Sequence, residues 1–266
     1  GDHRDLHLYI RRQLQMCIRD RDKTVKYRKR QKSSFKFILD LKKNNAILEI
    51  GPGDGLLTKK IFPKVKEMVA IEIDPLLIKH LSIRSDLKGL KIIHGDILRQ
   101  DIEELPIKNP VRIVGNIPYN ITSSIIFWLI EQLDFWEDAH IMLQKEVAER
   151  LIAQVGTKQY GRLTVVVGVY LDVNLCFKIP PDVFYPKPKV DSAIVRFTKK
   201  DVPIISDDQY NKFNKIVKSA FLMRRKMLRN SLSGFEIDDK IKDEIDFSRR
   251  PETLSINEFA KLLCIE

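Results

Sequence analysis

Four short apolar segments restrict the fold of this chain more than any other feature of its sequence. They have the composition of buried β-strands, and each leads into glycine or ends in polar residues. The four segments are residues 46–50, 68–74, 90–96 and 111–116. In an open α/β sheet, ligands bind at the carboxyl ends of the strands. We therefore expect the polar groups that follow these segments to share one binding edge.

The first segment leads into a glycine-rich turn, GPGDG at residues 51–55, and then into a helix predicted over Leu56 to Phe62. The N–H groups of such a turn approach a ligand closely, and a helix N-terminus favours an anionic group. A glycine turn alone is weak evidence for a binding site, because many α/β proteins use one only for packing. Its spacing differs from the GxGxxG of dinucleotide-binding proteins, which favours S-adenosylmethionine as the cofactor.

Acidic residues at the next two strand ends suit the nucleoside part of that cofactor. Glu72 can accept hydrogen bonds from both ribose hydroxyls, and Asp96 can accept one from the adenine amine. The sulfonium would then point toward Asn116. We expect no metal, because the three cysteines are scattered and have no metal-ligand spacing.

The fourth segment ends in Asn-Ile-Pro-Tyr at residues 116–119, a combination that suits the exocyclic amine of an adenine base. The Asn116 side-chain oxygen and a backbone carbonyl can both accept hydrogen bonds from that amine. Pro118 fixes the turn, and Tyr119 offers a flat face on which a base can stack. The alternative is a strand end with a turn proline and a buried tyrosine.

Composition points to a polyanion partner. The 266 residues carry a net charge of +11, with 44% hydrophobic and 31% charged residues. Such a basic chain favours nucleic acid over a membrane as partner, although a solvated basic surface without a partner is the alternative. No apolar run is long enough to span a bilayer, and no secretory signal is visible, so we expect a cytoplasmic protein.

Nine motifs, in the order given below, resemble those of the KsgA-type ribosomal RNA adenine dimethyltransferases. The resemblance covers residue 36 to the C-terminus. It implies a Rossmann-like, seven-stranded class I methyltransferase sheet that uses S-adenosylmethionine, with a small all-α C-terminal domain. It also implies dimethylation of two adjacent adenosines near the 3′ end of small-subunit ribosomal RNA, and a role in small-subunit maturation. The motifs are EIGPGDGLLT, IEID, HGDIL, GNIPYNIT, LQKEVAERL, YGRL, FYPKPKVDSAIVRF, FLMRRKMLRNSL and RPETLS. The VDS within the seventh motif and the RPETLS tail favour small-subunit over large-subunit RNA as the substrate.

The resemblance and the chemistry of the residues together assign roles to individual residues. Catalytic residues are expected at Asn116, Pro118 and Tyr119. Cofactor-binding residues are expected at Gly51, Gly53, Glu72, Ile73, Asp96, Ile97 and Asn116. Residues that contact the RNA are expected at Phe184, Lys187, Lys189, Arg224, Arg225 and Lys226.

Three regions are predicted along the chain: a poorly ordered basic segment at 1–34, a methyltransferase domain at 35–200, and a helical RNA-binding domain at 201–266. Residues 211–232 hold seven Lys or Arg and no acid, and their apolar residues recur at helical spacing. They predict one amphipathic helix with a basic face. A merely solvated face is the alternative.

Further helices, a strand and core residues are predicted along the chain. Helices are expected over 121–133, with Thr122 or Ser123 as N-cap, and over 145–154. A fifth strand is expected at 139–143. The β-branched residues of 163–170 favour a strand, but the resemblance makes this segment a helix. Trp128 and Trp136 are interpreted as core residues, and Phe184 either walls the base pocket or plugs the core under its loop.

Two alternatives and one departure accompany these predictions. The chain shares the NIPY and proline-loop patterns with Erm-type large-subunit RNA methylases, and a ribosome-assembly or nucleic-acid-binding factor with little turnover is a second possibility. The family usually has a Gly-Gln-x-Phe-Leu-like segment before the first strand, whereas residues 30–35 read RQKSSF. This departure bears on cofactor affinity and turnover. A monomer acting on a precursor of the small ribosomal subunit is expected.

Overall fold

The computed structural model describes residues 39–184 and 188–264. The predicted basic segment 1–34, the departure at 30–35 and Lys187 lie outside this part. The described chain packs into two compact units. The first consists of the residues up to Lys145 and of Leu175–Arg196, and the second of Glu146–Asn174 and the residues from Phe197 onward. The domain limits at 35 and 200 stay a prediction, and residues 146–174 pack with the C-terminal region.

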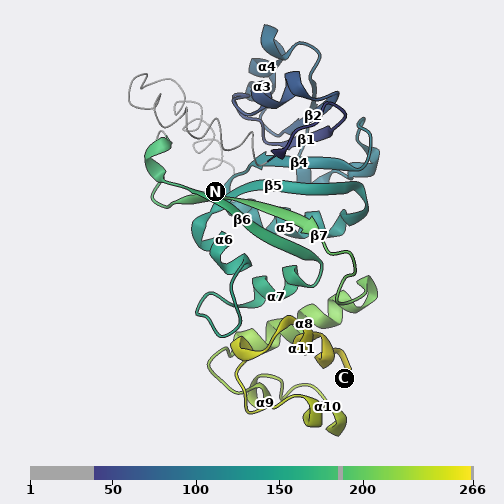
Figure 1. Ribbon diagram of the computed structural model, residues 1–266, viewed down its shortest axis with the longest axis vertical. Helices are drawn as coiled ribbons and strands as arrows, with labels where there is room; N and C mark the ends of the chain where they lie inside the picture. Colours follow the sequence, from purple (N-terminus) through teal and green to yellow (C-terminus); the bar gives the residue numbers. More distant parts are fainter. Residues whose placement is uncertain (1–38, 185–187, 265–266) are drawn as a thin grey trace. The chain divides into compact units, whose positions relative to one another are not determined.

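The described residues contain the seven-stranded sheet that the resemblance implied (Figure 1). The strand order is β3-β2-β1-β4-β5-β7-β6, and β3, β2, β1, β4 and β5 pair in parallel. The strands are β1 (Ala46–Ile50), β2 (Glu67–Glu72), β3 (Lys91–His94), β4 (Val111–Asn116), β5 (Trp136–Gln144), β6 (Leu171–Ile179) and β7 (Ser192–Lys199).

The central strands form because their apolar runs are buried almost throughout. Every residue of β1 after the first is buried, and β4 is buried until Asn116, which is exposed at its end. Such runs are typical of parallel strands covered on both faces. The amino-terminal half of β4 is joined to β5 by a buried ion pair, in which the Arg112 guanidinium donates to both Asp138 carboxylate oxygens at 2.8 Å.

Helices of the first unit follow the strands. They are α3 (Thr58–Ile61), α4 (Pro75–Ser82) and α5 (Thr122–Glu131). Helix α4 begins at a proline, and the Asp74 carboxylate caps it by accepting from Leu76 N–H at 2.8 Å. The N-cap predicted for α5 was wrong: Ile121 occupies that position and provides no side-chain hydrogen bond, while Thr122 is buried.

The second unit is helical apart from the strand ends that it shares with the sheet (Figure 1). Segment 163–170, ambiguous in sequence, is helical, as the resemblance implied: its valines are buried, and Thr164 Oγ1 accepts from Gly161 N–H at 3.1 Å. The helices are α6 (Lys145–Leu151), α7 (Arg162–Gly168), α8 (Tyr210–Leu222), α9 (Leu228–Ser231), α10 (Asp239–Glu244) and α11 (Ile256–Lys261).

The single helix predicted over 211–232 was wrong in extent. Helix α8 ends at Leu222, the chain turns, and α9 begins at Leu228. Helix α8 is amphipathic as predicted, with Phe213, Ile216, Val217 and Ala220 buried. In the turn that follows, Arg224 donates to backbone carbonyls of the second unit that are distant in sequence.

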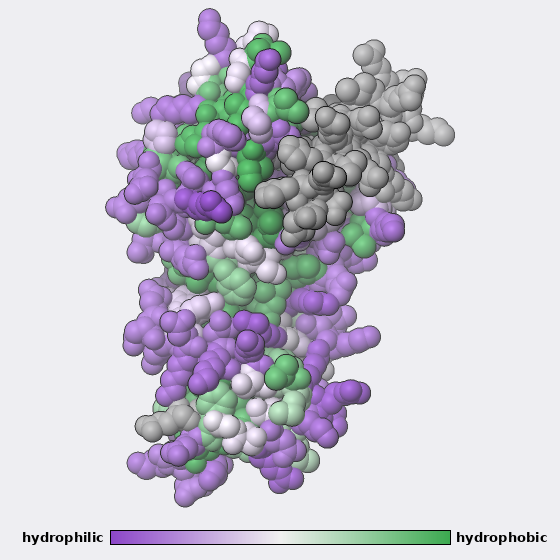
Figure 2. Space-filling model, turned by 180° about the vertical axis from the view of Figure 1, so that it is seen from behind, coloured by the Kyte–Doolittle hydropathy of each residue, from purple (hydrophilic) through white to green (hydrophobic). Residues whose placement is uncertain are grey.

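Trp128 and Trp136 are core residues, as predicted. Both are buried, and each indole N–H donates to a backbone carbonyl, Gln100 O at 2.9 Å and Leu129 O at 2.8 Å. On the face seen in Figure 2, hydrophobic residues appear in patches among hydrophilic ones. Among the large apolar side chains that are exposed are Ile73, Leu222 and Met223.

Candidate active site

The strand order reverses direction between β1 and β4, and this switch point is where open α/β sheets bind ligands. The two strands are paired at Ile50 and Gly115, so Gly51 and Asn116 end them side by side. A Cβ atom added at Gly51 would lie 3.8 Å from the Asn116 carbonyl oxygen. The structure therefore brings together two residues that the sequence assigned to the site from segments far apart in the chain.

The glycine turn has a conformation that requires glycine, because Gly51, Gly53 and Gly55 have φ of 65°, 60° and 76°. Gly53 and Gly55 differ in their surroundings. A Cβ at Gly55 would come within 2.7 Å of Leu81 Cδ2, so this residue permits close packing. A Cβ at Gly53 would meet nothing within 4 Å. Gly53 therefore borders open space, as a residue that lets a ligand approach the backbone should.

Glu72, at the end of β2, is buried and holds the glycine turn. Its Oε2 accepts from Gly53 N–H at 3.1 Å, and its Oε1 accepts from Ile73 and Asp74 N–H at 2.9 and 3.1 Å. Burial raises the pKa of this carboxyl, and the three backbone bonds offset only part of the effect. A carboxylate has about four acceptor positions. One position is thus left for a ligand hydroxyl.

The end of β3 lies next to that of β2. Gly95 N–H donates to the Glu72 carbonyl at 3.0 Å, which places Asp96 beside Glu72 in the sheet edge. Asp96 Oδ1 accepts from Leu98 N–H at 3.0 Å, and the carboxylate keeps a partly exposed oxygen 4.0 Å from Arg99. Of the two apolar residues assigned to the cofactor, Ile73 is 48% exposed and Ile97 is buried. Ile73 therefore presents an apolar face beside Glu72.

Glu49 was missed by the sequence reasoning, although an acid within an apolar strand is itself a signal. It lies two residues before Gly51 and is 1% exposed, with Oε2 making no hydrogen bond within the described chain. Burial raises its pKa to about 7, the nearby Thr58 hydroxyl lowers it in part, and the charges of Glu72 and Asp54 raise it further. Three carboxylates therefore surround the glycine turn.

At the end of β4, Pro118 precedes a short 3-10 turn over Tyr119–Ile121. Tyr119 is half-buried, and its hydroxyl lies 2.6 Å from the Ser192 hydroxyl. Ser192 is fully buried at the start of β7; it belongs to the VDS motif, but no individual role was predicted for it. The exposed amide of Asn116 and the ring of Tyr119 thus lie at the same strand end.

The loop between β6 and β7 carries three of the six residues that were expected to contact RNA. Phe184 is half-buried and packs against the core cluster of Met142, Ile179 and Ile194. Part of its ring therefore serves the core, which is one of the two interpretations offered from sequence. Lys189 is exposed, and Lys187 lies outside the described residues.

The cluster of Arg224, Arg225 and Lys226 divides into two kinds of residue. Arg224 donates to the carbonyls of Lys158 and Thr157 at 2.8 and 3.1 Å. Arg225 and Lys226 are exposed. We infer that Arg224 holds the turn after α8 in place, whereas the two exposed cations are available to phosphates.

Exposed apolar residues adjoin these cations. Leu222 is 79% exposed, and Met223 and Met227 are 43% and 38% exposed. The turn between α8 and α9 thus combines exposed cations with exposed apolar side chains.

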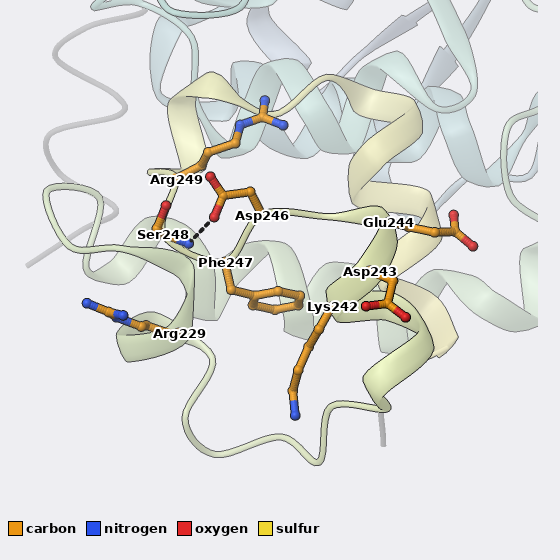
Figure 3. A pocket seen from close by; sticks show the side chains of 8 residues that line it. All are labelled: Arg229, Lys242, Asp243, Glu244, Asp246, Phe247, Ser248 and Arg249. Carbon is orange, nitrogen blue, oxygen red and sulfur yellow. Dashed lines mark hydrogen bonds between the residues drawn. The ribbon is translucent and has the colours of Figure 1, made fainter.

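An open hollow in the second unit combines cations and carboxylates around the Phe247 ring (Figure 3). Arg249 pairs with Glu258, and Glu244 pairs with Lys261. These pairs leave little net field to select a ligand of one sign, and we assign no ligand to the hollow. Its lining residues are Arg229, Lys242, Asp243, Glu244, Asp246, Phe247, Ser248 and Arg249.

Residues 39–184 and 188–264 contain no cluster of three or more His, Cys, Asp or Glu arranged to hold a metal ion. Within the same residues, none of the helices has the length and apolar character needed to cross a membrane.

Comparison with known proteins gives consistent matches over most of the chain. Residues 36–263 match the family model for ribosomal RNA adenine dimethylases. The chain is 38% identical over 231 residues to the Ribosomal RNA small subunit methyltransferase A of Francisella tularensis subsp. novicida, which covers 85% of this chain and 88% of the relative. It is 42% identical over 219 residues to the protein of that name from Legionella pneumophila, which covers 81% of this chain and 84% of the relative.

Two solved structures are similar over nearly the whole chain. A dimethyladenosine transferase from Plasmodium falciparum has a TM-score of 0.74 and 27% identity, and the match covers 87% of this chain and 93% of that one. The 23S rRNA methyltransferase ErmE has a TM-score of 0.68 and 26% identity, and the match covers 91% of this chain and 97% of that one.

Proposed function

Because the chain belongs to the ribosomal RNA adenine dimethylase family and is therefore a methyltransferase, we propose that it methylates the N6 amines of two adjacent adenosines near the 3′ end of small-subunit ribosomal RNA. The proposed methyl donor is S-adenosylmethionine, and the modification belongs to small-subunit maturation. The observation that carries this proposal is the pairing of Gly51 and Asn116 at the switch point of the sheet. A cofactor site and an amine-binding amide meet there.

The residues at the edge fit this cofactor. When bound, S-adenosylmethionine supplies a methyl group that is activated by a sulfonium, and its methionine part also carries an ammonium. Glu49 Oε2 has no partner among the described residues, and with Glu72 and Asp54 it makes the edge negative. The open space at Gly53 admits the methionine part, and Glu72 keeps an acceptor for a ribose hydroxyl. Asp96 and Ile73 suit the adenine.

The target amine is held by Asn116. An adenine amine is a poor nucleophile, because its lone pair is delocalised into the ring. We propose that the Asn116 side-chain oxygen and a backbone carbonyl at Ile117–Pro118 accept its hydrogens, while Tyr119 stacks on the base. These groups contribute position and electrostatics, and no strong base is needed, since the alkylated amine loses its proton readily. The base has to leave its stack to reach this strand end.

The RNA is proposed to contact the exposed cations of the second unit, Arg225 and Lys226, together with Lys189 of the loop before β7. Their exposure on turns leaves them free to approach phosphates, and their contribution should depend on salt. Arg224 supports this surface through the backbone of residues 157–158.

The test is methyl transfer from labelled S-adenosylmethionine to unmethylated small ribosomal subunits, with large-subunit RNA as a parallel substrate and Asn116→Ala as the inactive control. Dimethyladenosine in small-subunit RNA alone is the expected result. Transfer to large-subunit RNA alone would instead support a second candidate, an Erm-type methylase, which the structural similarity to ErmE favours. Transfer to neither, with cofactor binding intact, would contradict both.

A further inference from the structure

Ser192 is a buried hydroxyl in contact with a residue proposed to hold the target base. It begins β7, is 0% exposed, and lies 2.6 Å from the Tyr119 hydroxyl, from which it is separated by 73 residues in sequence. An O–H···O distance of this length is a strong hydrogen bond. The contact therefore links the strand end that carries Asn116 to the strand that follows the proline-rich loop.

The position of Ser192 is itself fixed by its neighbour. Asp191 accepts from the Lys145 backbone N–H at 2.9 Å through its carbonyl, and its carboxylate binds Lys145 Nζ at 3.0 Å. Lys145 directly follows the end of β5. The hydroxyl that meets Tyr119 therefore rests on a segment held at two points and buried in the sheet, and it provides a rigid support.

Tyr119 needs such a support to act on a base. It lies in a short 3-10 turn outside the strand, and its ring is only half-buried. A tyrosine ring rotates about two side-chain bonds, so a ring that is to present one face to a base gains from an anchor at its far end. The Ser192 hydroxyl lies at that end.

We propose that Ser192 is a positioning residue that fixes the Tyr119 ring in the orientation that receives the target adenine. This inference rests on the proposed function, because it presupposes that Tyr119 contacts the base. Ser192 is itself fully buried, so it acts on the base only through Tyr119. Removing the Ser192 hydroxyl should therefore remove one orienting hydrogen bond and lower kcat by a few-fold to tenfold.

The experiment is a double-mutant cycle with Ser192→Ala, Tyr119→Phe and the double variant, assayed on small ribosomal subunits. Each single variant should lower kcat by about 3- to 10-fold, with less change in KM for the subunit. The double variant should be no slower than either single variant, because both remove the same bond. Binding of S-adenosylhomocysteine, measured by calorimetry, should be unchanged in all three.

Ser231→Ala is the matched control. Ser231 is also buried, and its hydroxyl donates to Leu228 O within its own short helix at 3.3 Å. This substitution removes a buried hydroxyl of the same size and should leave kcat unchanged even if it lowers the melting temperature. Ser192→Thr, which keeps the hydroxyl, should recover kcat partly if the protein folds.

Three results would overturn the inference: an unchanged kcat for Ser192→Ala, a loss in Ser192→Ala that Tyr119→Phe does not share, or losses that multiply in the double variant. Tyr119→Ala separates these failures from failure of the proposed function. If it loses transfer while Ser192→Ala does not, the role of Ser192 is refuted and that of Tyr119 stands. If Tyr119→Ala transfers normally, the proposed role of Tyr119 fails as well.

Discussion

The carboxyl edge of the sheet and the segment 211–232 carry opposite charges in opposite surroundings. At the edge, Glu49 and Glu72 are buried carboxylates around a glycine turn, and burial raises the pKa of both. Segment 211–232 has seven Lys or Arg and no acid, and Arg225 and Lys226 are exposed. One region is negative and shielded from water, and the other is positive and solvated.

The difference matches the two ligands of the proposed reaction. A small cation such as a sulfonium gains most from buried carboxylates, because salt screens them little. A polyanion gains from many exposed cations, and that attraction falls steeply with ionic strength. Cofactor affinity should therefore depend on pH and hardly on salt, whereas RNA affinity should depend strongly on salt. Each prediction below tests one side of this division.

The largest effect is expected for a substitution at Asn116, which leaves both the buried carboxylates and the exposed cations in place. Asn116→Ala should reduce transfer by about 10²-fold or more, because it removes the acceptor that positions the amine. Cofactor binding and subunit binding should each stay within about twofold, since the carboxylates and the cations remain. Single-turnover transfer, calorimetry with S-adenosylhomocysteine and sedimentation with subunits measure the three quantities. A variant that transfers normally would contradict the assignment of Asn116.

The negative side is tested by Glu72→Gln. Loss of the carboxylate should weaken cofactor binding by about 10- to 100-fold, since hydrogen bonds to a charged group contribute about 1.5–3 kcal/mol. Subunit binding should not change. Glu67→Gln is the matched control, because Glu67 begins the same strand and lies at the opposite edge, where it accepts from Lys108 N–H. Equal losses in both variants would indicate a general defect of β2.

Much of this edge was predictable from sequence, and the reason is local. The strand segments and the glycines that follow them are patterns of adjacent residues, and parallel pairing then brings their ends together. The β-branched residues of α7 favoured a strand, whereas the family motifs correctly predicted a helix. The segment is helical because burial of its valines outweighs their intrinsic preference for strands.

What the sequence did not predict depends on contacts between distant residues. Helix α8 ends at Leu222, and Arg224 in the following turn donates to carbonyls more than 60 residues earlier, at Lys158 and Thr157. Ser192 meets Tyr119 across 73 residues. The raised pKa of Glu49 comes from burial by surrounding elements. Periodicity along the chain records which residues share a face, and it contains no signal for such pairs.

The positive side is tested by Arg225→Ala/Lys226→Ala. The affinity for small subunits should fall by about tenfold at low salt, and the slope of log K against log salt should decrease by about two. Cofactor binding should be unaffected. The control is Lys240→Ala/Lys242→Ala, which removes two exposed cations from α10 and should leave the slope unchanged. An equal decrease in both would mean that the segment 211–232 is only a solvated face.

Arg224→Ala should behave differently from its neighbours. It loses two hydrogen bonds to backbone carbonyls and the partly buried contact with Glu252, so it should lower the melting temperature by a few degrees. The salt slope should change less than in the variant that lacks Arg225 and Lys226. A normal melting temperature with a reduced slope would place Arg224 on the RNA instead.

The smallest effect on ligand affinity is expected for Glu49, whose charge changes with pH. Burial raises the pKa of this carboxyl from 4.5 to about 7, so the folded protein holds a proton there that the unfolded chain releases. The folding stability that depends on this group is therefore present at low pH and is lost as pH rises from about 4.5 to 7. Glu49→Gln, which stays neutral, should gain stability over the wild type across that window, by on the order of 3 kcal/mol at most.

Protonation of Glu49 should also change the affinity for the cofactor. An ionised Glu49 attracts the sulfonium and ammonium of S-adenosylmethionine, whereas S-adenosylhomocysteine lacks the sulfonium charge. The affinity ratio of the two ligands should therefore shift toward S-adenosylmethionine by about 3- to 5-fold between pH 6 and pH 8, and Glu49→Gln should abolish this shift. Calorimetry with both ligands at each pH measures it without turnover. A ratio that is independent of pH in the wild type would mean that Glu49 supports the glycine turn as a neutral acid and takes no part in cofactor selection.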